Sequence, residues 1–218
     1  MRKIVSVEQE TKNPYLNMFH LDVRNEHNKK SNYYVASRAK TMEELKLNTR
    51  QDKADGVFVL CIYQDEKEQE EKIVLVRQYR CSIDDWIYEY PAGLVDEGED
   101  YKTAGKRELK EETGLDFIPI DVDEMYTKPR YTSIGMTDEA CGIVYGYATG
   151  SISKEWQEEN EEIDIVLANR EEVRRILKEE KIAVGCAYMM MHFLHTLEGH
   201  VFDFLQSASC KDKENHVE

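Results

Sequence analysis

Three glutamates, Glu108, Glu111 and Glu112, crowd one edge of a segment whose composition predicts a helix. Residues three and four apart in a helix are neighbours, so these carboxylates would repel one another. Arg107, four residues before Glu111, neutralises only part of this charge. A bound hard cation would remove the conflict, and Mg²⁺ is usually held by one or two carboxylates together with substrate phosphates. The spacing favours a metal site, although a solvated charged face is the alternative for these residues alone.

The helix that would carry the glutamates has clear end signals. Asp100 is a suitable N-cap, because its side chain can accept a hydrogen bond from a free backbone N–H. Thr113 and Gly114 end the helix, since glycine takes the left-handed position after a helix without steric cost. Gly93 and Gly98 bracket the preceding loop, where the backbone could need positive φ or close approach to a ligand.

The whole stretch from residue 93 to 115, GLVDEGEDYKTAGKRELKEETGL, resembles the Nudix box, G-x5-E-x7-R-E-U-x-E-E-x-G-U with U aliphatic. Every specified position is filled. The resemblance implies an α/β fold, the Nudix α/β/α sandwich with a mixed sheet, here with a small N-terminal β region. It also implies hydrolysis of a nucleoside diphosphate linked to another group. The box glutamates would hold divalent metal, with Mg²⁺ as the cofactor and Mn²⁺ as a substitute.

The residues before the box resemble the ADP-ribose pyrophosphatase branch of Nudix enzymes. VRQYR ends at Arg80, and EYPAG precedes the box. By this resemblance Arg80 contacts substrate phosphate, Ala92 gives a backbone carbonyl to a metal, and Glu89 matches a glutamate whose role stays open. The sequence departs from the branch at Ile134, where that branch usually has proline. This departure bears on the substrate more than on the reaction.

An acidic run, EWQEENEEID at 155–164, follows later in the chain. In the branch that the sequence resembles, a loop at this place carries the general base. The resemblance places Glu159 at the base position and Glu161 near a metal, while the choice of base among Glu159, Glu161 and Glu162 stays open. A loop of this kind would move during the reaction. A solvated acidic loop is the alternative.

Composition narrows the class of protein. Apolar residues make up 41% and charged residues 33% of 218 residues, which indicates a soluble globular chain with one good core and an appendage. The net charge of −15 disfavours nucleic-acid binding, which depends on Lys and Arg at phosphates. Five scattered cysteines without a CxxC pair disfavour a zinc site and suit a reducing compartment. The N-terminus lacks an apolar signal core, so we expect a cytoplasmic protein with no membrane partner.

Three regions are predicted along the chain: an N-terminal β hairpin and dimerisation region at 1–50, a Nudix catalytic domain at 51–206, and a flexible tail at 207–218. The predicted strands cover 15–23, 33–37, 57–63, 73–80, 86–90, 117–127, 141–148 and the end of 155–168. Short or full helices are predicted from Thr41, over the box, over 170–180 and over 184–198. Met189 to Met191, His192 and His195 are interpreted as structural, and residues 129–140 as a loop.

The resulting hypothesis is Mg²⁺-dependent hydrolysis of ADP-ribose to AMP and ribose 5-phosphate. Glu111 would be a metal ligand or an orienting partner, and Arg107 would hold the carboxylates. Tyr33, Tyr34 and Arg38 are candidates for contact with the base, unless the tyrosines only fill a sheet face. The resemblance also implies a homodimer that shares N-terminal strands. The alternatives are another Nudix substrate (a sugar nucleotide, a dinucleoside polyphosphate or an oxidised dNTP) and a non-catalytic ligand sensor with the Nudix fold.

Overall fold

The structure is a computed structural model that describes residues 3–64, 70–157, 162–196 and 200–205. The chain forms two compact units. The first contains Met1–Asp55 together with Pro129–Cys141, and the second contains Gly56–Lys128 together with Gly142–Glu218. Each unit has a hydrophobic core of its own.

The first unit is built on a three-stranded antiparallel sheet in the order β1-β2-β3. Alternation places Phe19 and Leu21 of β2 on the buried face, where they pack with Val35 and Leu45. The predicted hairpin corresponds to β2 and β3, and β1 extends it into a sheet. The elements of this part are β1 Lys3–Gln9, β2 Asn17–Arg24, β3 Lys30–Ser37 and α1 Lys46–Thr49.

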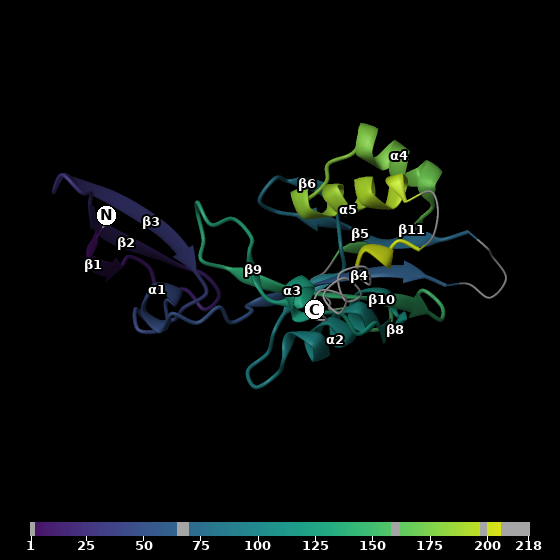
Figure 1. Cartoon of the computed structure of the whole chain (residues 1–218), viewed down its shortest axis with the longest axis horizontal. Coiled ribbons are helices and arrows are strands. Elements are labelled where there is room, and N and C mark those ends of the chain that lie inside the picture. The colour runs from purple at the N-terminus through teal and green to yellow at the C-terminus, as the bar shows by residue number, and fades with distance from the viewer. Residues whose placement is uncertain (1–2, 65–69, 158–161, 197–199, 206–218) are drawn as a thin grey trace, which may run out of the picture. The chain divides into compact units, whose positions relative to one another are not determined.

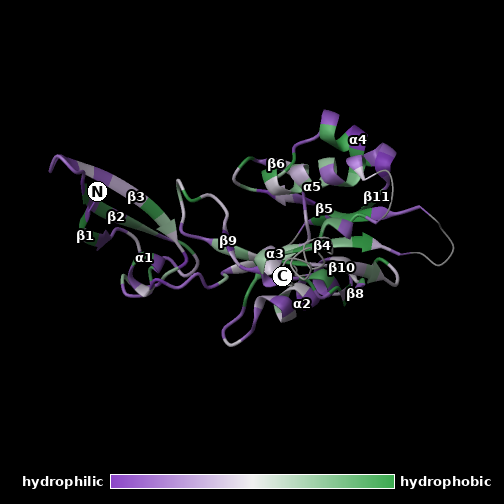
Figure 2. Cartoon of the chain, in the orientation of Figure 1, coloured by the Kyte–Doolittle hydropathy of each residue, from purple (hydrophilic) through white to green (hydrophobic). Residues whose placement is uncertain are grey.

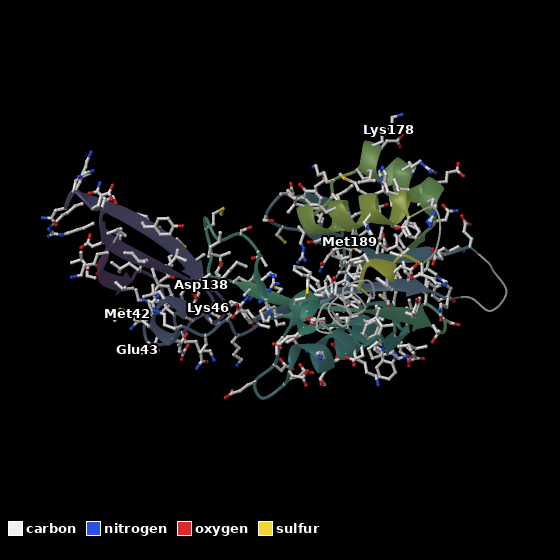
Figure 3. The ribbon with its side chains drawn as sticks, viewed as in Figure 1. Met42, Glu43, Lys46, Asp138, Lys178 and Met189 are labelled. Carbon is white, nitrogen blue, oxygen red and sulfur yellow. The ribbon has the colours of Figure 1, made fainter. Side chains whose placement is uncertain are left out.

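The segment from residue 129 to 141 belongs to this first unit, where it contacts β3 and α1. Ala36 donates its backbone N–H to the carbonyl of Met136 at 2.8 Å, and Tyr33 donates its hydroxyl to the carbonyl of Gly135 at 2.8 Å. The Lys46 N–H donates to Asp138 at 3.3 Å, a pair labelled in Figure 3. The predicted loop also contains a short strand, β9 Arg130–Tyr131, which pairs with the start of β10.

The second unit is a sheet between two layers of helices. The central strand order is β11-β5-β4-β10-β8, with β6 beside β5 and β7 beside β4. Figure 1 shows α2 on one face of this sheet and α4 and α5 on the other. The strands are β4 Gly56–Tyr63, β5 Lys72–Arg80, β6 Asp85–Glu89, β7 Ala92–Leu94, β8 Asp116–Pro119, β10 Ala140–Thr149 and β11 Ile163–Ala168. The helices are α2 Tyr101–Thr113, α3 Glu124–Thr127, α4 Arg170–Glu179 and α5 Val184–His195.

Strand β4 supplies both faces of this core, which explains its continuous apolar sequence. Val59 packs in a cluster with Leu109 of α2, whereas its neighbour Leu60 packs in a cluster with Met190 and Phe193 of α5. Successive side chains of a strand point to opposite faces, so one strand serves both layers. Figure 2 shows the hydrophobic colour along β4 and its neighbour β5. The arrangement confirms the predicted α/β/α sandwich.

Some local predictions were wrong. The strand predicted over 117–127 ends at Pro119, and Glu124–Thr127 form a helical turn because the Asp123 side chain accepts from the Met125 N–H at 2.8 Å. The helix expected from Thr41 begins only at Lys46, after a turn in which Glu44 accepts from the Lys40 N–H at 2.7 Å.

The predicted structural roles of the residues in α5 hold in part, because Met191 and His195 are exposed. Met190 is fully buried, while Met191 is 45% exposed and is not a core residue. His192 and His195 contact backbone carbonyls, His192 that of Val201 and His195 that of Met191. Over the described part of the chain, none of the helices has both the length and the apolar character that a membrane crossing requires.

Candidate metal and active site

Helix α2 begins and ends where the sequence predicts. The Asp100 side chain accepts from the backbone N–H groups of Lys102 at 2.9 Å and Thr103 at 3.1 Å, which satisfies two of the free donors of the first turn. The Thr103 hydroxyl donates to Asp100 at 2.8 Å and is the largest cause that holds the pKa of Asp100 below its usual value, with the backbone bonds as further causes. Gly114 ends the helix with φ of 74°. Ala104 and Leu109 of α2 are buried in the cluster that contains Val59, and this packing sets the face that α2 turns to the sheet and the direction in which its glutamates point.

Glu108 points from α2 onto the backbone of Gly93 in β7. A Cβ atom built on Gly93 would lie 1.8 Å from Cδ of Glu108 and about as close to both of its oxygens. Only a residue without a side chain leaves room for the carboxylate there. The glycine that opens the box is thus explained by close approach of the strand to an acidic group.

Glu112, one turn further along α2, is also directed at β7. It is 3% exposed, and its Oε2 accepts from the backbone N–H of Ala92 at 3.1 Å. A buried carboxylate is costly unless it is paired or hydrogen-bonded. Glu108 and Glu112 therefore converge on the Ala92–Gly93 backbone. Their oxygens fit the all-oxygen preference of a hard divalent cation.

Arg107 links the carboxylates of the box. Its guanidinium donates to Glu99 at 3.0 Å, Glu108 at 2.8 Å and Glu111 at 2.9 Å, and to the Leu94 carbonyl at 3.0 Å. The hydrogen bond with Arg107 is the main cause that lowers the pKa of Glu99, and the same bond is the largest cause that raises the pKa of Arg107. One planar group with five donors can serve all these acceptors, which an ammonium cannot.

Arg80 and Glu89, the two residues predicted before the box, bind each other. Arg80 lies at the end of β5 and donates its Nε–H to Glu89 of β6 at 2.6 Å. Nearby, the guanidinium of Arg77 lies 4.9 Å from the ring centre of Trp86. The structure therefore pairs the predicted phosphate-binding arginine with a carboxylate of the same unit.

Tyr34 and Arg38 belong to the first unit. Arg38 forms a bond of 2.8 Å with Glu139, and Tyr34 stacks on His20 with ring centres 4.9 Å apart. Their predicted contact with the base stays a prediction.

Glu159 and Glu161 lie outside the described residues, as does the predicted tail at 207–218. The chain just before them is held to the end of α2. The Gln157 side-chain amide donates to the Glu112 carbonyl at 2.7 Å, and the Ser153 N–H donates to the Thr113 carbonyl at 3.0 Å.

Two residues of this region, Gln157 and Glu99, had no predicted role. No local signal in the sequence marks Gln157 as an anchor. Glu99 did carry a signal, because it occupies a fixed box position, but the sequence did not predict its hydrogen bond with Arg107.

Comparison with known proteins supports this description. The family model of the NUDIX domain matches residues 52–193, and the chain belongs to the Nudix family. The methanol dehydrogenase activator of Bacillus methanolicus is 31% identical over 133 residues, which span 59% of this chain and 68% of that protein. The ADP-ribose pyrophosphatase of Saccharomyces cerevisiae is 45% identical over 60 residues, which span 28% of this chain and 26% of the yeast protein.

The match thus spans about two thirds of the bacterial relative and about a quarter of the yeast relative. A solved structure described as an ADP compounds hydrolase superimposes with a TM-score of 0.57 over 82% of this chain and 83% of that chain. Its sequence is 17% identical, so this likeness supports the fold alone. Family and fold agree with the resemblance of the box.

Proposed function

We propose that this Nudix hydrolase cleaves the pyrophosphate of ADP-ribose, with Mg²⁺ as cofactor, to give AMP and ribose 5-phosphate. The observation that carries the proposal is the convergence of Glu108 and Glu112 on the Ala92–Gly93 backbone. These oxygen donors suit Mg²⁺ rather than a soft metal. Mn²⁺, which also accepts oxygen ligands, is the expected substitute.

Glu108, Glu112 and the Ala92 carbonyl would hold the metal, with Glu161 as a further ligand. Bound metal would neutralise the charge that develops on the pyrophosphate oxygens. Arg107 keeps the carboxylates of Glu108 and Glu111 in position through the bonds of 2.8 and 2.9 Å.

The remaining residues act on water and substrate. Glu159 would take a proton from a water molecule, whose oxygen then bonds to one phosphorus. The bond from that phosphorus to the bridging oxygen breaks, and the bridging oxygen leaves with the second phosphate. Arg80 would bind a substrate phosphate after exchanging Glu89 for it, since phosphate and carboxylate suit the same guanidinium fork. Tyr34 and Arg38 would contact the base.

ADP-ribose is favoured among Nudix substrates by the VRQYR and EYPAG segments and by the name of the yeast relative. Two facts are reasons to test other substrates beside ADP-ribose: position 134 is isoleucine, and the bacterial relative has a different name. We further propose that the chain acts in the cytoplasm as a homodimer that shares N-terminal strands. A mass equal to one chain in sedimentation analysis would contradict the proposed homodimer.

Product identification tests the proposal directly. Purified protein and Mg²⁺ are incubated with ADP-ribose, UDP-glucose, GDP-mannose, diadenosine polyphosphates and 8-oxo-dGTP, and the products are separated by chromatography. AMP and ribose 5-phosphate, formed faster than any other product, are the expected result. Faster cleavage of another compound would keep the box chemistry and reject ADP-ribose. Absence of cleavage throughout would favour a ligand sensor, which binding measurements with the same compounds would then test.

A further inference from the structure

A second group of metal-ligating side chains lies in the first unit, on the three-stranded sheet. It consists of Glu8 on β1, Glu10 just past the end of that strand and His20 on β2, and one ligand atom from each lies within 4.8 Å of the others. None of these residues belongs to the Nudix box or to its flanks. The question is whether strand geometry and chemistry make this group a binding site.

The sheet register brings the three side chains to the same face. Glu8 is the cross-strand partner of His20, and His20 is in turn the partner of Tyr34 on β3. The ladder continues past the end of β1, because Glu10 donates its N–H to the Met18 carbonyl at 2.9 Å. Glu8 and Glu10 are two apart, so they point to one side of the strand. The opposite face is the one that holds buried Phe19 and Leu21.

His20 carries the observation that points to a ligand. Its Nε2 atom is buried and has no hydrogen-bond partner, the only such side-chain nitrogen or oxygen among the described residues. A buried polar atom without a partner is costly, and such atoms in native proteins call for an explanation. The ring itself is stacked on Tyr34 with an angle of 25° between the planes, which fixes its orientation.

The two glutamates supply the opposite charge. Both are exposed, Glu8 on the edge strand β1 and Glu10 just after it, where carboxylates alone can serve to keep the edge from pairing with other chains. That role needs no imidazole. An imidazole nitrogen and two carboxylates around one point would instead hold a divalent cation and neutralise its charge, and the Nε2 atom has no hydrogen bond that metal binding would have to break.

We propose that Glu8, Glu10 and His20 form a site for a divalent transition metal of the Zn²⁺ type, separate from the Mg²⁺ site of the Nudix box. Imidazole nitrogen suits Zn²⁺ and its neighbours in the transition series, whereas Mg²⁺ takes oxygen ligands and keeps several waters. Three protein ligands leave a further position for water. The exposed glutamates can rotate to shorten the present spacing to the distances at which a metal is bound. The site does not depend on the proposed hydrolase activity.

Titration calorimetry with Zn²⁺ tests the site in the full chain, with millimolar Mg²⁺ present to occupy sites made of oxygen alone. The expected result is about one more Zn²⁺ equivalent in the wild-type protein than in His20→Ala. Replacement of both carboxylates, Glu8→Gln with Glu10→Gln, should weaken binding at least about 10-fold, since loss of a direct ligand costs no less than loss of an outer partner. Visible absorption of Co²⁺ in place of Zn²⁺ gives a second readout.

His27→Ala is the matched control, because His27 belongs to the same sheet region and its exposed side chain lies near Glu26 rather than the cluster. It should bind Zn²⁺ as the wild type does. His20→Gln guards against misfolding of the alanine variant, and thermal unfolding with and without Zn²⁺ should show metal-dependent stabilisation only where His20 is retained. Equal Zn²⁺ binding by the wild type and both His20 variants would overturn the proposal. So would binding that requires the glutamates but not the histidine.

Discussion

The carboxylate of Glu108 occupies the space that a side chain at Gly93 would need, with 1.8 Å between the carboxylate carbon and the position that a Cβ atom of residue 93 would take. Gly93 lies in β7 and Glu108 in α2, so the contact joins the loop-entry strand to the helix of the box. The pair explains why glycine is favoured at position 93, 15 positions before the acid that fills this space.

Replacement Gly93→Ala should therefore damage function more than folding. Gly93 has no positive φ, and the atoms it would displace are the flexible end of a side chain. We expect a loss of about 1 kcal/mol in the free energy of unfolding, the low end of the range for an overfilled site. Moving the Glu108 carboxylate by about 1 Å should lower kcat about 100-fold. Denaturant unfolding and steady-state hydrolysis of ADP-ribose measure the two effects.

Gly185→Ala is the control for this substitution. Gly185 lies in the first turn of α5, and apart from its chain neighbours and the backbone of α5, no described atom lies within 4 Å of its Cβ position. Alanine there should leave kcat unchanged and keep or raise stability, because glycine is the poorer helix former. An unchanged kcat in Gly93→Ala would mean that the position of Glu108 does not matter for the reaction.

Helix α2 shows what the sequence predicts well. Asp100 and Gly114 mark its ends through hydrogen bonds and backbone angles that depend on neighbouring residues only. The fixed spacing of the box predicts Glu108 and Glu112 as metal ligands, and the structure brings both carboxylates to the Ala92–Gly93 backbone. Local signals of this kind are readable without knowing the rest of the fold.

Contacts between segments that are distant in the sequence could not be predicted from such local signals. The bond from Tyr33 to the Gly135 carbonyl joins residues about 100 positions apart, so the placement of the 129–141 segment in the first unit had no local signal. Strand β1 is mostly exposed and lacks an apolar run, so it was missed. The pairing of Arg80 with Glu89 likewise depends on the register of β5 and β6.

The variant Glu112→Gln should keep the fold and lose activity. Its amide oxygen can still accept from the Ala92 N–H, which lies 3.1 Å from Glu112 Oε2 in the wild type, so the buried site stays hydrogen-bonded. The negative charge that a metal requires is lost. Because metal stabilisation of a transition state amounts to several kcal/mol, kcat should fall about 100-fold or more.

Glu97→Gln is the matched control, since Glu97 is an exposed acid in the loop of the same box. It should keep the wild-type kcat and the wild-type dependence on Mg²⁺ concentration. Full activity in Glu112→Gln would reject the metal site at α2.

Arg107→Lys should loosen the carboxylate cluster. Lysine cannot replace the bonds from one guanidinium to Glu99, Glu108, Glu111 and the Leu94 carbonyl. We expect a loss of about 1.5–3 kcal/mol in the free energy of unfolding, the range for hydrogen bonds to charged groups. As a positioning residue, Arg107 should also set metal affinity, so the Mg²⁺ concentration for half-maximal activity should rise about 10-fold or more.

Arg175→Lys provides the comparison. Arg175 donates to Glu172 at 2.8 Å and to Glu180 at 2.5 Å, a similar network on α4. Its replacement should reduce stability while leaving the Mg²⁺ dependence of activity unchanged. A rise of the same size in both variants would show that Arg107 acts through general stability and does not position the metal ligands.

Acid should weaken the fold partly through Glu99. Its hydrogen bond with Arg107 lowers the pKa of Glu99 from the usual value of 4.5 in the folded state. A lowered pKa means that the unfolded chain binds the proton more readily, so this group stabilises the fold above pH 4.5. That contribution is lost as the pH falls from 4.5 through the lower pKa of the folded state. As the pH falls through this window, the free energy of unfolding should therefore decline less steeply in Glu99→Gln than in the wild type.

Urea unfolding at a series of pH values from 7 downwards measures the slope, with Glu97→Gln as the control that should keep the wild-type slope. Parallel slopes in wild type and Glu99→Gln would exclude the bond between Glu99 and Arg107 as a source of acid sensitivity, and the decline would then be assigned to other lowered carboxyl groups, such as Asp100 at the start of α2.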